Sequence, residues 1–126
     1  MAAVAQIFLD GLATQDFASL AAAFSDDVHL RALLPGGFRE WDGVTELEAR
    51  FARWFGDTLA YELVDTDIGV IGPRLSLRWR ARLQAERLGP GWHLVEQEAY
   101  AEIDGHGRIE RLSLVCSGYL AEPADG

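Results

Sequence analysis

The sequence predicts an α+β fold in which a long, curved antiparallel sheet wraps over helices from the N-terminal half. Three observations predict it. Apolar residues recur at helical spacing in three stretches before residue 56. After residue 59 the pattern changes to alternation, most clearly from Arg74 to Leu83, which is typical of a strand with two different faces. Asp104-Gly105 separates two further alternating runs, and this is a strong hairpin signal.

Two short helices are expected at the start of the chain. The first is predicted from Ala3 to Ala13, where the apolar residues form one stripe. The second is predicted from Asp16 to Phe24, with Thr14 or Asp16 as its N-cap. Ser25-Asp26-Asp27 is expected to end this helix.

A third, longer helix is predicted after Asp42-Gly43, with Asp42 as its N-cap and Gly56 at its end. Its apolar residues share one face: Val44, Leu47, Phe51, Trp54 and Phe55. Short strands are predicted before it, at Val28–Leu33 and Phe38–Trp41. The long strands are predicted after it, at Leu59–Ile71, Arg74–Leu83, Trp92–Ile103 and Arg108–Tyr119.

Length and composition indicate one domain. The chain has 126 residues, of which 49% are hydrophobic, and this is enough for a full core. We expect the domain to span residues 1–121 and residues 122–126 to form a flexible tail. The single cysteine, Cys116, excludes an internal disulfide and indicates a reducing compartment.

The charge excludes some partners. A formal net charge of -9 argues against nucleic acid, because phosphate backbones are bound by clustered Lys and Arg. No apolar run approaches the roughly 20 residues that a membrane span requires. The first residues, MAAVAQIFLDGL, lack the basic start of a signal peptide. We therefore expect a soluble, cytoplasmic protein that binds neither nucleic acid nor membranes.

Three segments resemble the nuclear transport factor 2-like superfamily, and within it the SnoaL-like group. FLDGLATQDFASLAAAFSDDVHL is similar to the family's opening, WDGVTELEARFARWF to its third helix, and AEIDGHGRIERLSLV to its last hairpin. The resemblance implies a cone-shaped α+β barrel, with a strongly curved antiparallel or mixed sheet around three N-terminal helices. It also implies an apolar pocket on the concave side and, in many members, a dimer through the outer side. Members include polyketide cyclases, ketosteroid isomerases, dehydratases, epoxide hydrolases and proteins without chemistry, so the fold leaves the function open.

Two polar residues, His93 and Gln97, are predicted on the inner face of the strand Trp92–Ile103. The glutamates of this strand place its even-numbered residues outside, so the odd-numbered ones face inward. The outer pairs expected across strands join Glu96 and Glu98 to Arg78, Arg80 and Arg82. A buried histidine can transfer a proton near neutral pH, and a glutamine can orient a carbonyl group or a water. The alternative is that His93 lies at the end of the sheet, solvated or hydrogen-bonded to backbone.

The walls of the expected pocket include two tryptophans, Trp79 and Trp54, which can stack on a flat ligand. Five smaller residues complete the predicted ligand-binding set: Leu77, Ala99, Leu114, Cys116 and Ala32. The alternative for the tryptophans is a plain core role. The alternative for Cys116 is a small buried hydrophobic side chain, and no histidine is paired with it in sequence.

The residues that the enzymatic relatives use are missing from this chain. Ketosteroid isomerases carry an aspartate base and a protonated aspartate as donor. Alignment on the family's segments places Ala32 and Ala99 at these two positions, so this chemistry is excluded. We also find no inward set that supplies the Asp–Arg–Asp cluster of the epoxide hydrolases.

Metal and cofactor sites are not expected. The three histidines, His29, His93 and His106, have no ligand spacing, and the chain has no glycine loop for phosphates. His29 and Arg31 are predicted to face solvent, unless the register of their strand slips by one residue.

Two hypotheses about function follow. The first is a pocket protein that binds a small apolar or flat molecule. If it is an enzyme, it is a cyclase, isomerase or hydratase that uses His93 as its general acid or base. The second is a non-catalytic module that forms a homodimer through the outer face of the sheet. The residues expected on that face include Trp92, Leu94, Tyr100, Val115 and Tyr119.

Overall fold

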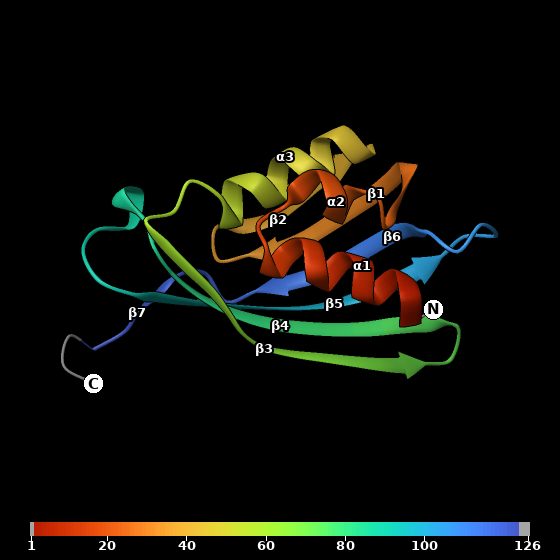
Figure 1. Cartoon of the computed structure of the whole chain (residues 1–126). Coiled ribbons are helices and arrows are strands. Elements are labelled where there is room, and N and C mark those ends of the chain that lie inside the picture. The colour runs from red at the N-terminus through yellow and green to blue at the C-terminus, as the bar shows by residue number, and fades with distance from the viewer. Residues whose placement is uncertain (1, 124–126) are drawn as a thin grey trace.

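The computed structural model describes residues 2–123. Its helices are α1 (Ala2–Ala13), α2 (Phe17–Ala21) and α3 (Val44–Phe55), with a 3₁₀ turn η1 (Glu86–Leu88). Its strands are β1 (Phe24–Leu34), β2 (Gly37–Asp42), β3 (Ala60–Ile71), β4 (Arg74–Gln84), β5 (His93–Ile103), β6 (Ile109–Cys116) and β7 (Leu120–Ala121). The three helices lie together on one side of the sheet, and the other side is open in this chain (Figure 1).

The strands form one mixed sheet in the order β2-β1-β6-β5-β4-β3, and β7 pairs with β5. The β1–β6 pair is parallel and the other pairs are antiparallel. The long strands curve around the helices without closing, since β2 and β3 remain as the two ends of the strand order. The predicted α+β class and the curved sheet around N-terminal helices are confirmed.

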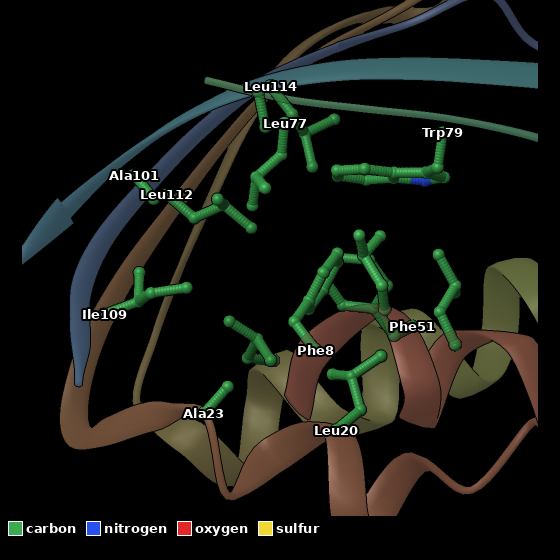
Figure 2. Packing of buried hydrophobic residues seen from close by; sticks show 14 of the residues in the cluster. Phe8, Leu20, Ala23, Phe51, Leu77, Trp79, Ala101, Ile109, Leu112 and Leu114 are labelled. Carbon is green, nitrogen blue, oxygen red and sulfur yellow. The ribbon is translucent and has the colours of Figure 1, made fainter. Parts of the chain in front are cut away.

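The core lies between the concave face of the sheet and the helices. The apolar residues of β4 are at most 1% exposed, as the alternation predicted: Leu75, Leu77, Trp79, Ala81 and Leu83. Trp79 faces the helices, where its ring centroid lies 5.0 Å from that of Phe8 and 6.4 Å from that of Phe51 (Figure 2). Aromatic side chains from α1 and α3 thus fill the space in front of Trp79.

The second helix is shorter than predicted, because Phe24 belongs to β1. Asp16 caps it as expected, and the Asp16 carboxylate accepts a hydrogen bond from the Ser19 amide at 3.1 Å. The helix ends at Ala21, since Phe24 pairs with Ile109 of β6 and packs edge-on against Phe8 at 5.8 Å. These long-range contacts override the local helical pattern.

The predicted cap of the third helix is wrong. Asp42 is the last residue of β2, and its carboxylate lies 2.6 Å from Nδ1 of His29 on the paired strand. Gly43 takes the N-cap position with a φ of 93°, which a residue without a side chain adopts readily.

Glu122, the residue after β7, is held in place by two contacts. The Glu122 carboxylate lies 2.9 Å from Nη2 of Arg82, and its amide donates to the Trp92 carbonyl oxygen at 3.0 Å. The flexible tail predicted for residues 122–126 stays a prediction. Residues 124–126 lie outside the described residues.

Candidate functional site

The inner face of β5 carries two polar residues among apolar ones. His93 is 7% exposed and Gln97 is 1% exposed, and they alternate with the buried Val95 and Ala99. Their predicted inward orientation is confirmed. His93 is the first residue of β5 and thus lies at the end of the strand, as the alternative expected, with its Nδ1 buried.

The orientation of the Gln97 amide is set by a neighbouring strand. Trp79 lies beside Gln97 in the β4–β5 register, and its indole Nε1 donates to Gln97 Oε1 at 3.0 Å. Because an indole can only donate, the amide oxygen must face it, and the amide nitrogen must point elsewhere. Gln97 therefore presents Nε2 as a donor with a defined direction.

Two buried nitrogens of this face have no hydrogen-bond partner among residues 2–123: Nδ1 of His93 and Nε2 of Gln97. A third such atom, Nε of Arg50, belongs to a guanidinium that lies 4.4 Å from the centre of the Trp41 ring. An unpaired buried polar atom costs about 1–3 kcal/mol, so each one needs a reason. Within residues 2–123 neither His93 nor Gln97 makes a cation–aromatic contact of this kind, so these two residues form the candidate site.

His93 and Gln97 cannot act on each other. They are four residues apart on one strand, so their Cα atoms are separated by about 13 Å, and Val95 lies between them. A direct proton relay between the two side chains is excluded by this separation. Either they contact different parts of one extended molecule, or each one acts alone.

A surface hollow opens at the same end of the molecule as the start of β5. It has a volume of about 300 Å³ and is lined by Ala52, Arg53, Trp54, Asp57, Arg87 and Tyr119. Figure 1 shows that the C-terminal end of α3, the η1 turn, β7 and the first residues of β5 lie at this end. The hollow lies at the same end of the sheet as His93, and its lining contains neither His93 nor Gln97.

The rim of this hollow is held by hydrogen bonds to the last carbonyl groups of α3. Arg87 donates to the Trp54 carbonyl oxygen at 3.2 Å and to that of Gly56 at 3.1 Å. The Tyr119 hydroxyl also donates to the Trp54 carbonyl oxygen, and burial raises the pKa of Tyr119. The prediction that Tyr119 lies on the outer face is wrong, because the chain turns at Gly118 and brings the ring against the core.

The predicted ligand-binding residues face inward and are packed. Trp54 lies between Phe51 and Trp41, with centroid distances of 5.2 and 5.9 Å. Four residues are buried in the core, namely Leu77, Ala99, Leu114 and Ala32, and Cys116 is partly buried against it. Their contact with a ligand remains a prediction.

The histidine on the first strand has a different role from His93. His29 and Arg31 face away from the core, as predicted for the unshifted register. His29 Nδ1 lies 2.6 Å from Asp42 and its Nε2 lies 2.8 Å from Glu40. Hydrogen bonds to Asp42 and then to Glu40 raise the pKa of His29, because both carboxylates favour its protonated form.

The predicted outer pairs are only partly present. Arg80 and Glu96 form an ion pair of 2.8 Å, as expected. Arg82 instead contacts Glu122 and, at 3.5 Å, Glu62 of β3. The guanidinium of Arg82 also stacks on the Trp92 ring, with 3.9 Å to its centre.

Metal-binding and membrane-spanning features are not found in the described part of the chain. Residues 2–123 contain no group of three or more His, Cys, Asp or Glu side chains arranged to hold a metal ion. Within the same range, no helix has the length and apolar character to cross a membrane.

Solved structures with this architecture come from several bacteria. An NTF2-like protein of unknown function from Cytophaga hutchinsonii aligns with a TM-score of 0.62 at 13% identity, covering 90% of this chain and 87% of that one. The chain has the NTF2-like fold. An LEH-like epoxide hydrolase of M. tuberculosis shares this fold with a TM-score of 0.67 at 23% identity, covering 90% of this chain and 80% of that one. A proposed polyketide cyclase of Xanthomonas campestris pv. campestris aligns with a TM-score of 0.70 at 16% identity, covering 90% and 87%.

The resemblance seen in the sequence is thus confirmed for the NTF2-like fold. No protein-family model matches the sequence, and no curated protein matches it either. With identities this low, the NTF2-like fold is established and the chemistry is not.

Proposed function

We propose that this protein binds a small apolar or flat molecule at the α3 end of the concave face. The observation that carries the proposal is the pair of buried, unpaired nitrogens, His93 Nδ1 and Gln97 Nε2. The aromatic core fills the space in front of Trp79, so the ligand enters through the hollow beside Trp54 and Tyr119. A hollow of about 300 Å³ lies at the small end of the range for ligand pockets.

The two nitrogens define the polar groups of the ligand. Gln97 Nε2 can only donate, so it suits a carbonyl or hydroxyl oxygen. Neutral His93 can donate or accept at Nδ1, depending on its tautomer. The apolar residues around them favour a ligand that is otherwise hydrophobic.

If the bound molecule is also a substrate, we propose His93 as the single general acid or base. A histidine that touches the ligand can take or give a proton, and such a group typically contributes about 10²–10⁴-fold to a rate. A cyclase, isomerase or hydratase reaction is compatible with one such group and an oriented donor at Gln97. Support comes from the fold that this chain shares with an epoxide hydrolase and a proposed cyclase.

Native mass spectrometry of freshly purified protein, compared with its denatured mass, tests binding. A bound small mass that is lost in His93→Ala and Gln97→Met, but kept in the outer-face control Ser76→Ala, is the expected result. A mass that persists in both inner-face variants would remove these residues from the site. Once the ligand is identified, unchanged turnover in His93→Ala would exclude the catalytic form.

A homodimer through the outer face is a second proposal, supported by exposed apolar residues. Leu33 lies beside Phe38 and Val115 in the strand register, and these side chains are 53%, 53% and 46% exposed. Nothing in the described chain covers this face, and large exposed apolar clusters mark interfaces. Size exclusion with light scattering tests the proposal, with Val115→Glu as the variant expected to dissociate the dimer. A wild-type monomer at high concentration would refute it.

A further inference from the structure

Three arginines gather around a hollow on the outer face of the sheet, away from the His93 site. The hollow has a volume of about 490 Å³. Its lining residues are Arg31, Ile71, Arg74, Tyr100, Glu102, Arg111 and Ser113. Tyr100 and Glu102 point outward from β5, on the opposite side of the strand from Gln97.

Strand register brings these residues together. One row across the sheet joins Arg111 of β6, Glu102 of β5 and Arg74 of β4. The next row joins Arg31 of β1, Ser113 of β6 and Tyr100 of β5. The cluster therefore has a rigid base in the sheet.

The charges in the hollow do not balance. Three guanidinium groups and one carboxylate, Glu102, line the hollow, and Glu102 lies 3.4 Å from Arg74 and 3.5 Å from Arg111. Both pairs are long and about half-exposed, so they hold the arginines weakly. An excess of positive charge in a chain of net charge -9 requires a reason.

Arg31 is fixed by a neutral partner. Its Nε and Nη2 both donate to Ser113 Oγ, at 3.1 and 3.0 Å. Glu40, the cross-strand neighbour of Arg31, is bound to His29 instead. Arg31 is thus oriented in the hollow without being neutralised.

Other carboxylates lie close by. Asp27 and Glu110 line a neighbouring hollow of about 380 Å³ together with His29, Glu102 and Arg111. Within residues 2–123 no ion pair joins Arg111 to either Asp27 or Glu110. The three arginines therefore keep N–H donors for an added anion, since each guanidinium carries five.

We propose that this hollow binds a small organic oxyanion, a phosphate monoester or a carboxylate with an apolar part. Arg31, Arg74 and Arg111 bind the anionic group, because the planar guanidinium matches the oxygens of phosphate and carboxylate. The half-exposed ring of Tyr100 and the side chain of Ile71 contact the apolar part. The hollow volume lies within the range of small-molecule sites.

Calorimetric titration at constant ionic strength tests this site, with phenyl phosphate and benzoate as probes. The test variant is the double Arg74→Gln/Arg111→Gln. The control is the double Arg78→Gln/Arg80→Gln, which removes the same amount of charge from the same face of the sheet but outside the hollow. Circular dichroism and melting temperature confirm that both exposed double variants fold.

The expected result is saturable binding of at least one probe by the wild type. The test variant should bind roughly tenfold or more weakly, because two charge-assisted contacts are lost. The control should change by less than about twofold, since distant exposed charges are screened. Binding of phenyl phosphate but not of benzoate would assign the site to phosphate esters.

Three results would overturn the proposal. The first is the absence of saturable binding to the wild type, and the second is an equal loss of binding in both double variants. The third is a wild-type dimer that binds neither probe and that the test substitutions dissociate, because carboxylates of a second copy would then occupy the hollow.

Discussion

Gln97→Met should leave the protein nearly as stable as the wild type, although it changes a fully buried, hydrogen-bonded residue. Two effects offset each other. The substitution leaves the Trp79 indole N–H without its acceptor, at a cost of about 1–3 kcal/mol. It also removes the buried, unpaired Nε2, whose cost to the wild type is about 1–3 kcal/mol. The net change in the free energy of unfolding should be within about 1 kcal/mol, or about 4 °C in Tm.

A double-mutant cycle measures the energetic coupling between Trp79 and Gln97. Trp79→Phe alone leaves both Oε1 and Nε2 of Gln97 unpaired beside a smaller ring, and should cost about 2–4 kcal/mol. The double variant Trp79→Phe/Gln97→Met removes every polar atom of the pair. It should be less destabilised than the sum of the single variants by about 1 kcal/mol or more.

Urea unfolding followed by circular dichroism measures all four proteins. A loss of more than about 3 kcal/mol in Gln97→Met would mean that Nε2 is hydrogen-bonded in solution. The main support for a ligand at Gln97 would then be gone.

Three further predictions concern stability. The pairing of His29 with Asp42 raises the pKa of His29 above 6.5. The stabilisation from this pair is therefore complete below pH 6.5 and is lost as the pH rises through the raised pKa. The Tm of the wild type should fall over that pH range, whereas the Tm of His29→Gln should not. Phe51→Ala should cost about 3–5 kcal/mol in urea unfolding, whereas the exposed Leu59→Ala should change little. Tyr119→Phe should cost about 1 kcal/mol by the same measurement, since one hydrogen bond to α3 is lost.

Alternation was sufficient to place the inner face of the sheet. Five apolar residues of β4 and the inward orientation of His93 and Gln97 could be predicted because a strand has a period of two. The hydrogen bond from Trp79 to Gln97 could not, since it depends on how β4 and β5 are aligned. Alternation fixes a face and leaves the register open.

The errors arose where contacts distant in sequence decide the structure. Phe24 joined β1 because Ile109 and Phe8 surround it. The Asp42 carboxylate contacts His29 on the paired strand and therefore does not cap α3. The arginine hollow draws its residues from β1, β3, β4, β5 and β6, so no local pattern could reveal it.

The parallel pair β1–β6 has a consequence for how the chain folds. Leu30 lies beside Leu112, so this contact joins residues 82 positions apart. During synthesis, the β3–β4–β5 hairpins can form from neighbouring segments, whereas β1 and β2 wait for a partner made near the end. Until β6 is made, the apolar edge of β1 has no strand beside it on that side. A nascent or truncated chain without residues 109–116 would therefore be prone to aggregate and dependent on chaperones.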